Sequence, residues 1–218
     1  MPGAGLRVGL YCPNHADEIF FHIMNQPVGQ YFDLFPTRIW RLSLKDVAPH
    51  FPDWVAQINA LRAAAPVPVG GSNRQGWNSK ERAVLHFPGF APLLATIRQS
   101  CNSAFAQMGL SNPAFEIESW ANVNDRGGFN FQHTHYGMLS GVFYLQVPPG
   151  AGNIVFRDPR PAVECSYLKG PAVNSFMDVP FVPEEGLLLL FPCWLQHRVE
   201  PHENDTPRIS IAFNAIWG

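Results

Sequence analysis

The sequence lacks the features of a membrane protein, a disulfide-stabilised protein or a nucleic-acid-binding protein. Its 218 residues contain four cysteines, at positions 12, 101, 165 and 193, and no CxxC pair, which argues against a zinc ribbon or a dithiol redox motif. No apolar run approaches the ~18 residues of a membrane span, and the first residues lack the pattern of a secretory signal. The formal net charge of −2 offers no attraction for nucleic acid or an anionic membrane. These absences predict a cytoplasmic protein that acts on small molecules.

The amino-acid composition indicates one folded domain. Hydrophobic residues make up 46% of the chain and aromatic residues 13%, which excludes a disordered polypeptide. A chain of this length can bury a core of its own and needs no second domain. We expect residues 1–114 to form an N-terminal arm with supporting helices, and residues 115–218 to form the core. Two-fold association is common among soluble chains, and the arm is a candidate contact for a homodimer.

The first half of the chain predicts one strand and two helices. Residues 32–44 favour a strand, whereas apolar spacing predicts helices over residues 54–65 and 90–108. Pro66 ends the first helix, and Gly109 ends the second. The Gly, Pro and Asn content of residues 68–78 predicts a loop between the helices.

From Phe115 onward, short apolar segments alternate with turn residues. Closely spaced strands of this kind indicate an antiparallel sandwich or barrel, with the preceding helices packed on its outside. We therefore predict a mainly β fold, a jelly roll with flanking helices. A proline-rich insertion over residues 159–183 is placed to cover the mouth of a site. The expected strands span residues 115–124, 139–147, 154–157, 186–191 and 209–216.

His133-Thr134-His135 has the spacing of two metal ligands on an extended segment. Imidazoles at positions i and i+2 project to the same side of such a segment, so both can reach one metal ion. His197 is the natural third ligand, because it follows an apolar run that reads as a buried strand. Imidazole suits zinc, copper, nickel and iron, so three histidines do not select a metal. Two other ligand sets stay open: His135 and His197 with a water or anion, and two histidines with a carboxylate such as Asp158.

Arg208 and Ser210 lie on one face of the last predicted strand, eleven and thirteen residues after His197. A guanidinium and a hydroxyl beyond a metal ion are suited to binding the far end of a dicarboxylic acid. Asn122 and Asn214 are further candidates for the cavity wall. The alternative is a structural ion pair of Arg208 with Glu200, Glu203 or Asp205.

These residues resemble the motifs of the 2-oxoglutarate (2OG) and iron(II)-dependent oxygenases, over roughly residues 119–217. The resemblance is greatest to an uncharacterised subgroup in which HxH takes the place of the usual HxD or HxE. It is carried by the HxH pair, the distal histidine and the following Arg-x-Ser. Further matching segments are Leu139-Ser-Gly-Val-Phe-Tyr-Leu145, Phe156-Arg-Asp-Pro-Arg160 and Leu190-Phe-Pro-Cys-Trp-Leu-Gln-His197.

The resemblance implies a double-stranded β-helix, which is a cupin-like jelly roll, and a dioxygenase of the hydroxylase type. It implies iron(II) bound by His133, His135 and His197, and 2OG whose far carboxylate is bound by Arg208 and Ser210. Tyr144 stands where related hydroxylases often place another donor to that carboxylate. Two other readings stay open: a cupin-like three-histidine iron dioxygenase that does not use 2OG, and a metal- or ligand-binding module without turnover.

Overall fold

The computed structural model describes residues 34–165 and 177–218, and the chain divides into two compact units, Met1–Thr37 and Arg38–Gly218. The fold described below is that of the second unit. The predictions for the N-terminal arm, for Cys12 and for a homodimer contact fall outside the described residues. The proposed boundary at residue 114 stays a prediction.

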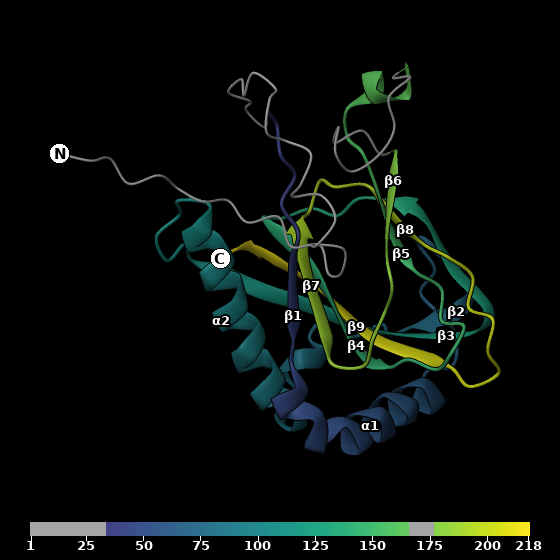
Figure 1. Cartoon of the computed structure of the whole chain (residues 1–218). Helices are drawn as coiled ribbons and strands as arrows, with labels where there is room; N and C mark the ends of the chain where they lie inside the picture. The colour runs from purple at the N-terminus through teal and green to yellow at the C-terminus, as the bar shows by residue number, and fades with distance from the viewer. Residues whose placement is uncertain (1–33, 166–176) are drawn as a thin grey trace, which may run out of the picture. The chain divides into compact units, whose positions relative to one another are not determined.

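Within residues 34–165 and 177–218, nine antiparallel strands form one curled sheet in the order β1-β7-β4-β9-β3-β8-β5-β6, with β2 paired to β3 (Figure 1). The predicted mainly β fold is therefore confirmed. The strands are β1 (Trp40–Ser43), β2 (Asn73–Asn78), β3 (Phe115–His133), β4 (Leu139–Gln146), β5 (Ile154–Arg157), β6 (Asp178–Phe181), β7 (Leu187–Pro192), β8 (His197–Val199) and β9 (Arg208–Trp217).

The long strand β3 belongs to two parts of the sheet. Its first ten residues, Phe115 to Asn124, pair with β9, whereas Asn130 and His133 pair with β8. Gly127 between these two stretches has a φ of +83°, a conformation that glycine adopts without steric cost. The sheet turns at this point, so β8, β5 and β6 continue from the second half of β3.

Two helices lie along one side of strands β1, β7 and β4 (Figure 1). They are α1 (Phe51–Ala64) and α2 (Ala91–Gln107), and both begin with a proline in the first turn, where its missing N–H leaves no hydrogen bond unmade. After α2, Gly109 has a φ of +82°, as expected of a residue that follows a helix end. Both helices predicted from apolar spacing are therefore confirmed. Four 3-10 turns complete the elements of the described residues: Lys45–His50, Val84–His86, Pro88–Phe90 and Pro161–Cys165.

Strand alternation separates the helix-packed core from the interior of the curled sheet. On β9, Ile209, Ile211 and Phe213 join the core that includes both helices, while Arg208, Ser210 and Ala212 face a cavity on the other side. Strands β4 and β7 are buried on both faces, which explains their nearly continuous apolar sequences. The cavity is therefore enclosed by strands that are fixed from behind by packing.

The structure corrects several predicted strand boundaries. Residues 73–78, predicted as part of a loop, form β2, and β3 continues from residue 124 to His133. The first predicted strand is limited to Trp40–Ser43. Strands β6 and β8 were not predicted, because each has only three or four residues and neither shows a clear apolar alternation.

Gly152 allows a close approach of two backbone segments. A Cβ atom on this residue would stand 2.0 Å from the carbonyl oxygen of Glu200 and 2.7 Å from that of Pro201. We expect Gly152→Ala to lower the free energy of unfolding by about 1–3 kcal/mol, because backbone atoms must move to admit the methyl group. Chemical denaturation would measure the loss, with the exposed Ser111→Ala as control; equal midpoints for both variants would contradict this expectation.

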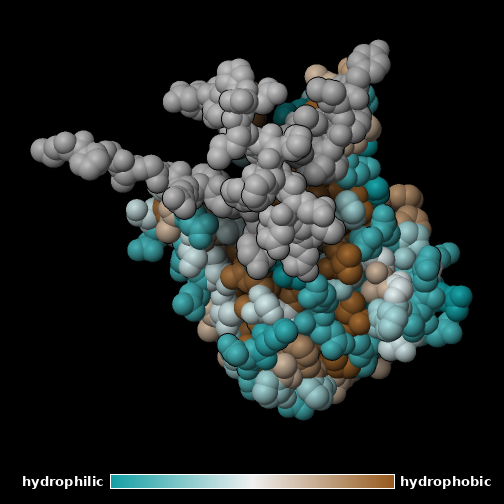
Figure 2. All heavy atoms as spheres, viewed as in Figure 1, coloured by the Kyte–Doolittle hydropathy of each residue, from teal (hydrophilic) through white to brown (hydrophobic). Residues whose placement is uncertain are grey.

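No helix in the described part of the chain is long and apolar enough to span a membrane. On the face shown in Figure 2, hydrophilic residues cover much of the described surface, with apolar residues among them.

Candidate metal and anion site

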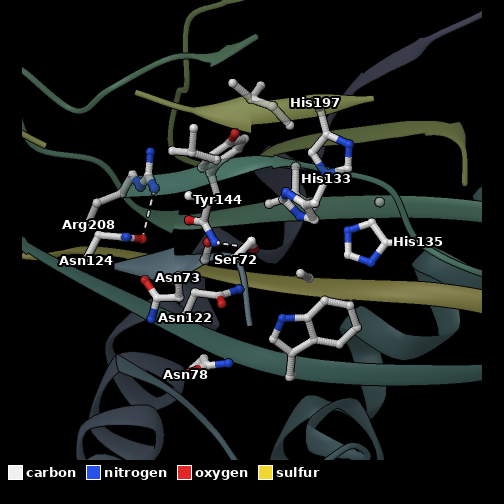
Figure 3. A pocket seen from close by; sticks show the side chains of 18 of the residues that line it. Ser72, Asn73, Asn78, Asn122, Asn124, His133, His135, Tyr144, His197 and Arg208 are labelled. Atoms are coloured by element: carbon white, nitrogen blue, oxygen red, sulfur yellow. Dashed lines mark hydrogen bonds between the residues drawn. The ribbon is translucent and has the colours of Figure 1, made fainter. Parts of the chain in front are cut away.

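Three histidine side chains converge at one end of the cavity (Figure 3). His133 ends β3 and His197 begins β8, and these two residues are direct partners across the two strands. His135 lies in the segment after β3, where its backbone N–H donates to the carbonyl oxygen of Cys193 at 2.9 Å. One ligand atom from each of the three residues lies within 4.8 Å of the others. The structure thus brings the three predicted ligands together.

Backbone carbonyl groups orient two of the imidazole rings. Nδ1 of His133 lies 2.6 Å from the carbonyl oxygen of Phe131, and Nδ1 of His197 lies 2.9 Å from that of Leu195. If Nδ1 carries the proton and donates it to the carbonyl, Nε2 keeps its lone pair for a metal ion. These hydrogen bonds hold both rings in the ligating tautomer.

Burial keeps the three imidazoles neutral. It lowers the pKa of His197 to about 3 and the pKa of His135 to about 4, and it also lowers the pKa of His133. A neutral imidazole is the form that binds a metal ion. The donor set therefore fits a divalent transition metal such as iron(II), for which imidazole is a suitable ligand.

No carboxylate belongs to this group of possible ligands in the described residues. Asp158, which was considered as an alternative ligand, instead accepts hydrogen bonds from Arg160 at 2.7 and 3.0 Å. It lines a separate hollow with Arg157 and Glu164. Of the three ligand sets left open by the sequence, the geometry favours the one with three histidines.

Arg208 lies in the same cavity, which has a volume of about 90 Å³. Its side chain is only 2% exposed, and it donates to the carbonyl oxygen of Gly152 at 2.8 Å and to Oδ1 of Asn124 at 2.9 Å. In the described part of the chain it forms no ion pair, and its Nε has no hydrogen-bond partner. Asp205, one of the predicted partners, pairs with Arg126. A buried guanidinium without a counter-ion and with a free donor fits a carboxylate ligand.

Ser210 and Tyr144 stand beside this guanidinium. They are direct partners across β9 and β4, both line the cavity, and they are 5% and 2% exposed. Burial raises the pKa of Tyr144 to about 12, although the charge of Arg208 acts in the opposite direction. The Tyr144 hydroxyl therefore stays protonated at neutral pH and can donate a hydrogen bond to an anion.

The asparagine content of the cavity was largely missed from the sequence. Asn122 lines the cavity as proposed, whereas Asn214 does not; its Oδ1 accepts a hydrogen bond from Ser140. Two of the missed residues belong to β2, which was predicted as a loop, so alternation could not assign them a face. The asparagines that line the cavity are Asn73, Asn78, Asn122, Asn124 and Asn130.

The comparison with protein families identifies the strand core. Residues 118–214 match the family described as "Putative 2OG-Fe(II) oxygenase". The expected similarity to the 2OG-Fe(II) oxygenases is confirmed. The family description names an oxygenase, which is an oxidoreductase, together with iron(II) and 2OG. It therefore agrees with the expected enzyme class and the expected cofactors. The matched residues include all six predicted site residues.

Solved structures share the fold of most of the chain. A prolyl-4-hydroxylase from Pseudomonas putida matches with a TM-score of 0.62 and 15% identity over 84% of this chain and 94% of that one. HygX from Streptomyces hygroscopicus, solved with nickel and 2-oxoglutarate bound, matches with a TM-score of 0.55 and 12% identity over 81% and 82%. No curated protein is significantly similar to the chain. The likeness to these structures confirms the double-stranded β-helix fold.

Proposed function

We propose that the protein is an iron(II)- and 2OG-dependent dioxygenase of the hydroxylase type, acting on a substrate that is not identified. One observation carries the proposal: three neutral imidazoles and a buried guanidinium without a counter-ion line the same small cavity. A metal ion and a dicarboxylate can therefore bind side by side. A cytoplasmic location, a small-molecule substrate and a homodimer remain part of the proposal.

His133, His135 and His197 would hold the metal ion from one side, which leaves its other positions open to ligands. Bound iron(II) would supply the activation of O₂ that amino-acid side chains cannot provide, with 2OG as the cosubstrate that is converted to succinate and CO₂. The backbone carbonyls of Phe131 and Leu195 support this role, because they fix two of the three rings before any metal binds.

Arg208, Ser210 and Tyr144 would bind the far carboxylate of 2OG. The guanidinium of Arg208, whose Nε has no hydrogen-bond partner within the described residues, and the protonated hydroxyl of Tyr144 would supply the donors. Binding an anion here would also compensate the charge of the buried guanidinium. Each hydrogen bond to the carboxylate would thereby orient the keto acid end toward the three histidines.

The third imidazole changes the charge of the proposed metal site. A neutral His135, in place of the usual carboxylate, leaves the full charge of a divalent ion uncompensated by the protein. An anionic ligand such as the keto acid end of 2OG is therefore attracted more strongly. Apolar side chains of Val142, Ile154 and Phe191 line the cavity beside the site and limit the access of water.

Anaerobic titration tests the proposal directly. We expect iron(II) and 2OG together to produce a weak visible charge-transfer band, and exposure to air to yield succinate. Saturation at about 100 times the Kd should raise the free energy of unfolding by about 2.7 kcal/mol, which is roughly 5–10 °C in Tm for a chain of this size. A titration without a band, without succinate and without a Tm shift would contradict the proposal.

The absence of a carboxylate among the described candidate ligands favours a second candidate, a three-histidine iron dioxygenase that does not use 2OG. In that enzyme the substrate itself would bind the iron, and Arg208 would hold a carboxylate of the substrate. The two candidates differ in one measurement, because only the first predicts that 2OG raises Tm in the presence of metal. A module that binds ligands without turnover would show the Tm shift but no succinate.

A further inference from the structure

His135 differs from the other two candidate ligands in what orients its ring. Backbone carbonyl groups accept from the rings of His133 and His197, whereas no hydrogen bond from a described residue reaches the ring of His135. A carboxylate at this position would be drawn to a metal ion by its charge. A neutral imidazole binds only when its lone pair points at the ion. The orientation of the His135 ring must therefore come from packing.

The indole of Trp120 is the packing neighbour of this ring. The two ring centroids lie 5.5 Å apart with an angle of 37° between the planes, within the range of favourable aromatic pairs. The other ring neighbours of His135 are the two remaining candidate ligands, at 4.9 Å for His133 and 5.1 Å for His197. Among the described residues, Trp120 thus supplies the one aromatic contact to His135 from outside the ligand group.

Trp120 is itself held in place by its strand and by Arg82. It lies in β3, where it pairs directly with Ala212 of β9, and it is only 9% exposed. The guanidinium carbon of Arg82 lies 4.7 Å from the centroid of the indole, which is a cation–π contact. The backbone of Arg82 is fixed to the same strand, because its carbonyl oxygen accepts from the N–H of Ser119 at 2.8 Å. The indole therefore presents a fixed surface to His135.

Glu118 fixes the chain next to His135 from the same face of β3. Alternation along the strand places Glu118 and Trp120 on one side. Oε2 of Glu118 accepts from the hydroxyl of Tyr136 at 2.6 Å, and its Oε1 lies 3.6 Å from Nε of Arg82. Because Tyr136 directly follows His135, this contact holds the backbone at His135. The ring of His135 is left to Trp120.

We propose that Trp120 is the positioning residue of the third metal ligand: its indole, held by Arg82, keeps the His135 imidazole in the orientation that binds the metal ion. The inference rests on the proposed function, because it needs a metal ion at the three histidines. Trp120 does for His135 what the carbonyl groups of Phe131 and Leu195 do for the other two rings. Without the indole, His135 would keep its backbone position but lose its ring orientation.

A double-mutant cycle tests this inference, with the zinc(II) affinity of the full chain measured by competition with a metallochromic indicator. We expect Trp120→Leu to weaken zinc(II) binding about three- to tenfold when His135 is present. In a His135→Ala background the same substitution should have no effect, because no ring is left to position. Trp120→Phe keeps an aromatic face and should restore most of the affinity. Trp217→Leu removes an exposed indole outside the cavity and should change nothing.

An equal loss of affinity from Trp120→Leu in both backgrounds would overturn the inference, because a merely structural residue behaves in that way. Unchanged affinity in the chain with His135 would overturn it too. If Trp120→Leu does not fold, Arg82→Met carries the same comparison, with an expected weakening of about two- to fivefold only where His135 is present.

Calorimetric titration with 2OG separates this inference from the proposed function. If 2OG does not bind, the proposed function fails, while the zinc(II) comparison still decides the role of Trp120. If zinc(II) does not bind to the unaltered chain, both fail. If the cycle shows no coupling between Trp120 and His135 but 2OG binds, the proposed function stands and this inference falls.

Discussion

Replacing Arg208 with alanine is expected to weaken 2OG binding about thirtyfold or more in the presence of a metal ion. Truncating one partner of a buried, hydrogen-bonded charge pair costs about 2–5 kcal/mol, and each 1.4 kcal/mol is a factor of ten in Kd. Arg208 provides the full charge of the anion end of the cavity, and within the described residues no other cation lines it. Isothermal titration calorimetry with 2OG, under anaerobic conditions, would measure the loss.

Two controls separate a lost ligand contact from a damaged fold. Arg126→Ala removes an exposed arginine, which pairs with Asp205, and should leave 2OG affinity unchanged. Arg208→Lys keeps the charge but lacks the planar fork that donates to Gly152 and Asn124 from two separate nitrogens, so we expect intermediate affinity. Full affinity in a folded Arg208→Ala protein would contradict the assignment of this residue to the cosubstrate.

Replacing His197 with alanine should abolish metal binding and any 2OG-dependent activity. Loss of an outer partner of a metal ligand typically costs about 10–100-fold in affinity, and loss of a ligand itself should cost at least as much. His197 is the most buried of the three histidines, and it joins the site from β8. Competition with a metallochromic indicator, using iron(II) or zinc(II), would measure the change in Kd.

His86→Ala is the matched control, because His86 is exposed and lies outside the group of possible ligands. It should bind metal as the unaltered chain does. His135→Ala tests the ligand set itself: a large loss is expected if three histidines bind the ion. A folded His197→Ala protein with unchanged metal affinity would contradict the proposed site.

The sequence predicted the candidate site best where charged or polar residues alternate with apolar residues along a strand. Strand β9 could be predicted because its apolar residues alternate with Arg208 and Ser210, and this alternation placed both on the cavity side. The convergence of His133 and His197 could be inferred because His133 belongs to an HxH pair and His197 follows an apolar run that predicts a buried strand. Their pairing across β3 and β8 depends on a bend of β3 that no local pattern predicts.

The cavity asparagines of β2 could not be predicted from the sequence because this strand lacks an apolar pattern. Strand β2, Asn-Arg-Gln-Gly-Trp-Asn, contains two asparagines and a glycine, which ordinarily favour a turn. It is a strand here because β3 supplies its hydrogen-bond partners over two separate stretches. Tertiary contacts thus overrode local propensity at this wall of the cavity.

Strand β3 connects the two ends of the proposed site through one continuous backbone. Its Asn124 holds the guanidinium and its His133 belongs to the metal group, so the span between them is set by covalent geometry together with the turn at Gly127. The distance between the guanidinium end and the histidine end of the cavity is therefore fixed by the fold. If a metal ion and 2OG bind as proposed, we expect a keto diacid one carbon shorter or longer to bind more weakly, because at a fixed span it cannot contact both the guanidinium and the metal ion.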